Sequence, residues 1–383
     1  MKKIKTVLTI LLLASIIAVG SVSSYSIEPP VSPMVFGIHE IGTGGHRIIS
    51  TILEGINEKY PDLTIRTMPS GVELVRVYLV RMGETLTGFG ATFLTYTLQE
   101  GIELYDEREW GPQPVRHLWI SRSPAKGLAL RADSDIFTFD DLRGKKVAHF
   151  EAYPASQKIV TALLRFGGLT WDDVVPVDFS SHAESYRAVK DGRIDVTMYN
   201  PLASAAYELE AAHGIRYLEM PEEDKEGWAR VAEYTSLYPP LKATRGAGLS
   251  EENPVPLLTE GYPIFFAYDS LDEDIAYWIV RAIHESREYY IKRDPYLEED
   301  WAIETFLDFW DSDTVPMHDG AIRYLKELGY WTPEREQMNQ NRLEHQKALK
   351  ATWDSVVIEA EQQKIKSVDF PKFWLEKRAE AGF

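Results

Sequence analysis

The segment at residues 37–61, GIHEIGTGGHRIISTILEGINEKYP, places a glycine-rich run directly before an amphipathic helix. Backbone N–H groups at a helix start can hold an anion, and Thr43, Gly44 and Gly45 offer a hydroxyl and close backbone approach to a carboxylate. A tight turn that lets the helix pack on its strand explains the same residues. His46, which follows them, is either a residue of the helix surface or a ligand contact.

Two nucleotide-binding motifs are absent from this run. GTGGHR does not end in Gly-Lys-Ser/Thr, as the phosphate loop of ATPases does, and it lacks the third glycine of the dinucleotide fingerprint in register. The anion that the loop would bind is therefore something other than a nucleotide phosphate.

The order of strand, small-residue loop and helix occurs four times, which predicts an α/β fold with parallel sheets covered on both faces. The four units lie at 34–56, 63–83, 145–166 and 194–213. Each loop follows the carboxyl end of a strand, where open α/β sheets place ligands. The repetition indicates a cleft that closes on a small solute.

Polar residues of these units and of the segment GFGATFLTY are further candidate ligand contacts: Ser70, Thr92, Thr95, Ser156, Tyr199 and Asn200. Each has a second explanation in local structure. The serines and threonines also suit helix caps, and Pro201 alone accounts for the turn after Asn200.

The first 27 residues predict an exported protein. Three lysines precede an apolar stretch at 7–19 and a small, mostly polar stretch at 20–26, the pattern of a signal peptide. The apolar stretch is shorter than the ~20 residues of a membrane-spanning helix. The chain has no cysteine, which excludes disulfides, thiolate metal sites and a lipid-modified cysteine. A net charge of -18 disfavours nucleic acid as a partner.

No catalytic or metal-binding motif stands out. His-Glu-x-x-His and Gly-x-Ser-x-Gly are absent, and DFWDSDT at 308–314 lacks the spacing of a calcium loop. We therefore expect no catalytic residues, no metal and no cofactor. A secreted enzyme remains the less favoured alternative.

Three segments carry a family resemblance: DDLRGKKVAHF at 140–150, GLTWDDVVPVDFSSHAESYRAVKDGRIDVTMYN at 168–200, and VPMHDGAIRYLKELGYW at 315–331. They resemble the TAXI group of solute receptors of tripartite ATP-independent periplasmic (TRAP) transporters, whose first loop is also a Gly-Thr-Gly-Gly run. The resemblance spans about residues 35–331. Asp319 stands where the family has proline.

The resemblance implies a two-lobed periplasmic-binding-protein-like fold of type II, with two hinge crossings. It also implies a periplasmic receptor that captures an organic acid or amino acid and delivers it to a TRAP-type permease. We expect a first lobe at 28–132 plus 256–331 and a second lobe at 133–255, with hinge strands at 128–135 and 255–270. A sensor or scaffold on the same fold is the alternative.

One departure from the family concerns the loop of the second lobe. Relatives keep this loop rich in glycine, whereas the present chain has EAYPASQ at 151–157. The resemblance thus makes Tyr153 a candidate that narrows the cleft and offers one hydroxyl to the solute.

The last segment, 332–383, lies beyond the resemblance. Thr332 suits a helix cap, Pro333 the first helical position, and Leu349, Trp353, Val356 and Ala360 share one face of the predicted helix. This extension is expected to pack on the chain's own lobes or on a second subunit of a homodimer.

Overall fold

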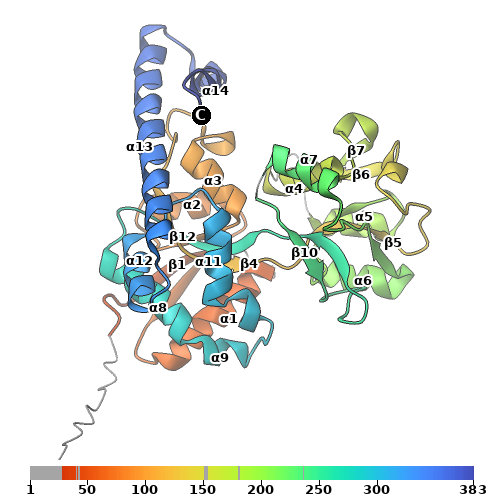
Figure 1. Cartoon of the computed structure of the whole chain (residues 1–383), viewed down its shortest axis with the longest axis horizontal. Helices are drawn as coiled ribbons and strands as arrows, with labels where there is room; N and C mark the ends of the chain where they lie inside the picture. Colours follow the sequence, from red (N-terminus) through yellow and green to blue (C-terminus); the bar gives the residue numbers. More distant parts are fainter. Residues whose placement is uncertain (1–27, 40, 42–43, 151–153, 180–181, 236) are drawn as a thin grey trace, which may run out of the picture.

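The computed structural model describes residues 28–383, except for positions 40, 42–43, 151–153, 180–181 and 236. The predicted signal peptide therefore lies outside the described residues. Figure 1 shows two α/β lobes side by side and a helical extension that projects from the first lobe. In the described part of the chain, no helix is both long and apolar enough to cross a membrane.

The first lobe is built on five strands. β1 and β2 pair in parallel, β12 lies antiparallel between β3 and β4, and a bridge between Phe36 and Thr87 joins the two groups. The strands are β1 (Met34–His39), β2 (Ile65–Ser70), β3 (Gly88–Gly90), β4 (Val115–Arg122) and β12 (Gly261–Tyr268). The helices are α1 (Gly44–Lys59), α2 (Glu73–Arg81), α3 (Thr92–Glu100), α8 (Glu273–Glu285), α9 (Arg287–Ile291), α10 (Leu297–Asp300), α11 (Ile303–Ser312) and α12 (Asp319–Glu327).

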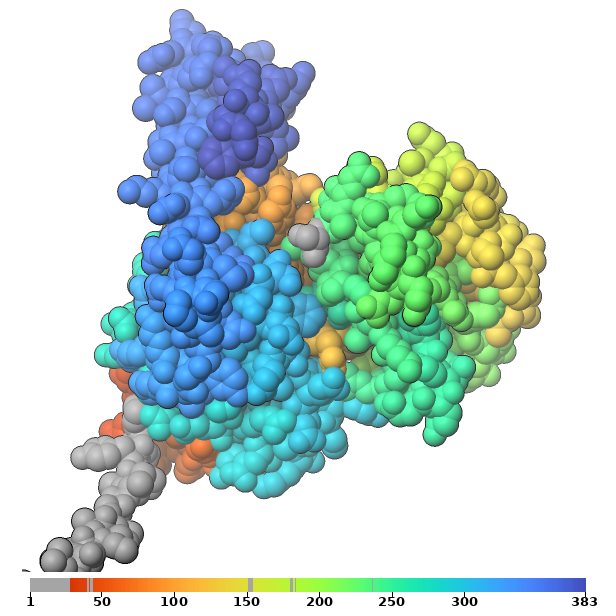
Figure 2. All heavy atoms as spheres, viewed as in Figure 1, coloured from red at the N-terminus to blue at the C-terminus, as the bar shows by residue number. Residues whose placement is uncertain are grey.

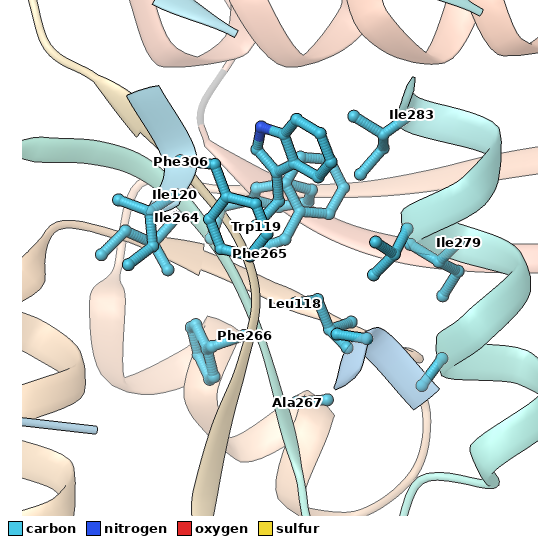
Figure 3. Packing of buried hydrophobic residues seen from close by; sticks show 14 of the residues in the cluster. Leu118, Trp119, Ile120, Ile264, Phe265, Phe266, Ala267, Ile279, Ile283 and Phe306 are labelled. Atoms are coloured by element: carbon cyan, nitrogen blue, oxygen red, sulfur yellow. The ribbon is translucent and has the colours of Figure 1, made fainter. Parts of the chain in front are cut away.

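Aromatic side chains fill the core of this lobe. Figure 3 shows Trp119 of β4 and Phe265 of β12 beside Phe306 of α11, and the rings of Trp119 and Phe306 stack at 4.8 Å between centroids. Ile279 and Ile283 of α8 lie on the other side of this group. The apolar stripe predicted for the first helix is buried in α1, as its spacing of three and four residues requires.

The second lobe has a smaller sheet and its own core. β5 lies antiparallel between β8 and β9, β6 pairs in parallel with β7, and a bridge from Val147 to Val196 connects β6 to the β8 side. The strands are β5 (Gly127–Arg131), β6 (Lys146–His149), β7 (Val175–Asp178), β8 (Thr197–Tyr199), β9 (Ile215–Tyr217), β10 (Pro240–Ala243) and β11 (Val255–Leu258). The helices are α4 (Pro154–Phe166), α5 (His182–Lys190), α6 (Ser204–His213) and α7 (Lys225–Tyr234).

The expected two-lobed α/β fold is confirmed, with two corrections. The sheets are mixed rather than parallel, because β12 and β5 enter their sheets from the crossing between the lobes and run against their neighbours. The first crossing also lies before residue 127 and not at 128–135, because β5 already pairs with strands of the second lobe.

The C-terminal extension consists of α13 (Pro333–Gln362) and α14 (Phe370–Glu380), which pack against each other. As predicted, α13 begins with Pro333, and the Thr332 side chain accepts a hydrogen bond from the N–H of Arg335. The predicted face of α13 is buried with α14 in a third cluster: Leu349, Trp353, Val356, Ala360, Phe370 and Trp374. This face of α13 is therefore covered within the extension by α14.

One buried acid in the first lobe predicts a pH-dependent stability. Asp313 is 6% exposed, and burial raises its pKa to about 6, although the N–H groups of Thr314 and Val315 donate to its carboxylate. His117, 4.0 Å away, is neutral because burial lowers its pKa to about 3. A carboxyl whose pKa is raised on folding loses stability as the pH rises from about 4 to 6.

Asp313→Asn keeps the oxygen that accepts both N–H groups and removes the titration. We therefore expect this variant to gain on the order of 3 kcal/mol of unfolding free energy relative to wild type between pH 4 and pH 7. Urea unfolding of both proteins at the two pH values measures this difference. A constant difference between them would contradict the assignment of the raised pKa.

Candidate functional site

Two short segments connect the lobes and are hydrogen-bonded to each other. The N–H of Ser123 donates to the carbonyl of Glu260 at 2.9 Å, and the Thr259 hydroxyl donates to the carbonyl of Ser123 at 2.9 Å. Lys126 and Leu258 exchange backbone hydrogen bonds at 2.8 and 3.2 Å. The crossing therefore consists of two paired segments, which we call the paired hinge, and Figure 2 shows the surface hollowed between the two lobes that it joins.

Strand ends of the first lobe converge beside this hinge. The parallel strands β1 and β2 end at His39 and Ser70, and β3 ends at Gly90. Helices α1, α2 and α3 begin shortly after these ends, and no described side chain caps the first N–H groups of α2 or α3. This is the edge of an α/β sheet where a ligand finds both loops and positive helix ends.

The second lobe repeats the arrangement. β6, β7 and β8 are followed by α4, α5 and α6, and the loops before α4 and α5 lie partly outside the described residues. The predicted succession of strand, loop and helix is thus confirmed for all four units.

The residues predicted from the first glycine loop lie at the start of α1. Gly44 is exposed, and an added side chain there would meet no atom within 4 Å. Gly45 is buried, and a Cβ on it would lie 2.2 Å from the Tyr262 hydroxyl. His46 is partly exposed on the same helix, 3.4 Å from the Ser50 hydroxyl. Thr43 lies outside the described residues.

The three described hydroxyl residues among those predicted in the first lobe make contacts within the lobe. The Ser70 hydroxyl accepts the N–H of Val72 at 3.1 Å. Thr92 donates to the carbonyl of Gly261 at 3.1 Å, which ties α3 to the hinge-side end of β12. Thr95 is a correction, because its side chain is fully buried and lies 3.0 Å from the ring of His117. It belongs to the core and is not available to a solute.

In the second lobe the predicted residues also differ in how far they are exposed. The Ser156 hydroxyl and the His182 ring nitrogen Nε2 are 2.9 Å apart at the starts of α4 and α5. The Asn200 side chain accepts the N–H of Leu202 at 2.9 Å, and Asn200 stays partly exposed. Tyr199 is a second correction, since its side chain is fully buried and its hydroxyl donates to the carbonyl of Tyr186. Tyr153 lies outside the described residues.

Sequence reasoning missed an arginine at this edge. Arg76 of α2 is only 4% exposed, and its guanidinium group donates to the carbonyls of Ser70 at 2.7 Å and Phe89 at 3.4 Å. Ser70 is the last residue of β2 and Phe89 is the middle residue of the short strand β3, so Arg76 lies beside the ends of both strands. Nothing in the sequence marks it, because its burial depends on contacts between separate elements.

A neutral histidine and a tyrosine lie beside Arg76. The rings of His39 and Tyr262 are 5.5 Å apart, and both lie close to Gly45. Burial, together with the positive charge of Arg76 and a smaller electrostatic effect of His46, lowers the pKa of His39 to about 3. Its Nε2 atom is enclosed and has no hydrogen-bond partner among the described residues.

The hinge itself carries a buried ion pair. The Lys126 ammonium lies 3.6 Å from one oxygen of Glu260 and 5.4 Å from the centre of the Tyr262 ring. Glu260 is 4% exposed, and burial raises its pKa although Lys126 opposes the shift. Its second oxygen and the Tyr238 hydroxyl are both enclosed without a hydrogen-bond partner in the described part of the chain.

A second ion pair joins the lobes away from the hinge strands. Arg245, in the loop after β10, lies 2.6 Å from Asp300 of α10. Asp300 also accepts a hydrogen bond from Arg122 at the end of β4. The lobes are thus held together by one shared carboxylate as well as by the hinge.

Among the described residues, no group of three or more histidine and acidic side chains is placed to hold a metal ion. The strand-end residues offer a cation, hydroxyls and backbone N–H groups, which are recognition groups for an anion.

The central part of the chain matches a known family. Residues 77–329, about two thirds of the chain, match the family model described as the NMT1-like family. The chain belongs to this family. The match begins after α1 and Arg76 and ends before the C-terminal extension.

Solved structures with similarity to this NMT1-like protein include three binding proteins. The periplasmic aliphatic sulphonate binding protein SsuA from Escherichia coli is 14% identical, with a TM-score of 0.47, and the similarity covers 82% of this chain and 94% of that chain. The alkanesulfonate-binding protein SsuA from Xanthomonas axonopodis pv. citri, bound to MOPS, is 13% identical, with a TM-score of 0.43 and coverage of 82% and 84%. A binding protein component of an ABC phosphonate transporter from Pseudomonas aeruginosa is 10% identical, with a TM-score of 0.44 and coverage of 85% and 99%.

Proposed function

We propose that this NMT1-like protein is a periplasmic solute receptor that captures a small carboxylate-bearing solute between its lobes and delivers it to a membrane permease. The observation that carries the proposal is the paired hinge, beside which both lobes present strand ends and helix starts. In this proposal the first lobe is residues 28–122 with 261–331, and the second lobe is 127–258.

The partner of the receptor is the finer part of the proposal. The resemblance to the TAXI group favours a TRAP-type permease, and a permease of the ABC type is the alternative. Crosslinking of the exported protein in intact cells, followed by mass spectrometry of the captured membrane protein, distinguishes these two classes. A soluble partner without any permease would favour a sensor on the same fold.

Native mass spectrometry of the protein as purified tests solute capture. A receptor that encloses its ligand is expected to retain a small molecule whose mass is lost on denaturation. Screening the same protein for turnover of the retained compound separates a receptor from a secreted enzyme, because a receptor releases the compound unchanged.

Closure of the lobes is the prediction that follows from the hinge. Small-angle scattering should give a smaller radius of gyration at saturating solute than without it, because hinged lobes close around a ligand. Identical scattering curves with and without a solute whose binding has been verified would argue against a closing cleft.

A further inference from the structure

We propose that Arg76 anchors the solute by a carboxylate group at the strand ends of the first lobe. This inference rests on the proposed function, which it deepens by naming the residue and the anionic group. Arg76 lies outside the residues that match the family, so its assignment comes from the structure alone.

The guanidinium group is held in place but has hydrogen-bonding capacity left. Nε donates to Phe89 and one N–H of Nη1 donates to Ser70, both to backbone carbonyls. Nη2 makes no hydrogen bond to any described residue, and it is not one of the enclosed polar atoms. The edge formed by Nη1 and Nη2 can therefore still donate to both oxygens of a carboxylate, the geometry that favours arginine at such sites.

The guanidinium group of Arg76 has no carboxylate in direct contact. In the described part of the chain it forms no ion pair within 4.0 Å, and the carbonyls that hold it carry no net charge. The nearest acid along the helix is Glu73, which attracts Arg76 without a direct ion pair and whose carboxylate also interacts with the Tyr105 hydroxyl. A buried cation is costly unless it is paired, so a bound anion would supply a direct partner.

Lys126 is the other cation near Tyr262 and is the less suitable anchor. It already has Glu260 as a partner at 3.6 Å, whereas Arg76 has two neutral carbonyls. The neighbouring His39 ring is neutral, so it does not compete with Arg76 for an anion. In a chain with a net charge of -18, Arg76 is a local positive site.

The test compares acids with their amides. Thermal shift and calorimetry are run with acetate, succinate and L-glutamate, with acetamide, succinamide and the diamide of L-glutamate, which lack a carboxylate, and with ethanesulfonate and inorganic phosphate as other anions. We expect wild type to bind at least one carboxylate and to bind its amide more weakly. Arg76→Gln should weaken the carboxylate about 100-fold, the effect of losing a charged bidentate pair, and should leave the amide unchanged.

Two further variants keep the result interpretable. Arg76→Lys retains the positive charge but lacks the two parallel N–H donors of a guanidinium group. Its affinity for the carboxylate should lie between those of wild type and Arg76→Gln, so it tests the anchor even if Arg76→Gln lowers the melting temperature. Arg81→Gln, at the exposed end of the same helix, should leave all affinities unchanged.

Three outcomes overturn the inference while the receptor function stands: equal carboxylate affinity in wild type and both Arg76 variants, a retained solute that lacks a carboxylate, or binding of ethanesulfonate or phosphate only. A wild-type protein that retains and binds no solute overturns the receptor function itself. The two failures are therefore distinguishable.

Discussion

Replacing Gly45 by valine is expected to abolish solute binding and to lower the melting temperature. A Cβ on this residue would lie 2.2 Å from the Tyr262 hydroxyl and 2.7 Å from Cδ2 of His39, closer than real contacts allow. Both rings would have to move, and they are the neighbours of Arg76 at the strand ends. Calorimetry with the solute retained by wild type measures the loss.

Gly44→Val is the matched control at the adjacent position. Its side chain would project into open space, so the fold should keep its melting temperature. Affinity should still be lost, because a β-branched side chain at the start of α1 blocks the approach of the solute to the backbone N–H groups. Unchanged affinity in Gly44→Val would show that the glycine loop does not contact the solute. Unchanged affinity in Gly45→Val would show that the strand ends beside the loop do not form the binding site.

Local patterns in the sequence were sufficient to predict the four strand–loop–helix units and their order. The spacing of Ile48, Ile49, Ile52, Leu53 and Ile56 predicts the buried face of α1, which the structure confirms. Periodicity works here because a helix buries whichever of its faces is apolar, and this information is local. The direction of β12 and β5 could not be predicted from local patterns, because it depends on the end at which each strand enters its sheet from the hinge.

The sequence predicted where in the fold the site lies, but only some of the residues at that position. Small residues after strands indicate the ligand edge, yet Thr95 and Tyr199 in the same segments proved to be core residues. Arg76, between Val75 and Val77, has the sequence pattern of an ordinary helix-surface arginine. Its burial arises only when β2 and β3 bring the carbonyls of Ser70 and Phe89 together beside α2, which no short pattern records.

The C-terminal extension contacts the C-terminal end of α3, and we call these contacts the clamp. The first residue of α3 is hydrogen-bonded to β12. Glu100, the last residue of α3, is 3% exposed and pairs with His345 of α13 at 2.8 Å and with Arg378 of α14. Burial would raise the pKa of Glu100, but hydrogen bonds and charges of these two partners together lower it. The residue after it, Gly101, accepts a hydrogen bond from the indole N–H of Trp374 at 2.7 Å.

Removing Trp374 is therefore expected to release the extension. Trp374 is fully buried and packs edge-on against Trp353 at 4.8 Å between ring centroids, so Trp374→Ala loses a large core side chain and leaves the Gly101 carbonyl without its donor. Such truncations cost about 3–5 kcal/mol. Hydrogen exchange should show this as lost protection in α14 and in the end of α3, with the core of the first lobe still protected.

Leu375→Ala provides the control for this change, because Leu375 is the adjacent residue and is 43% exposed. It should alter the unfolding free energy by no more than about 0.5 kcal/mol.

Solute affinity in Trp374→Ala should stay within about threefold of wild type, since the nine residues of α3 separate the clamp from the strand ends by roughly 13 Å. Unaltered protection of α14 would show that the extension is held by other contacts. A large loss of affinity would show instead that the clamp sets the position of the whole helix, and with it the geometry of the solute site.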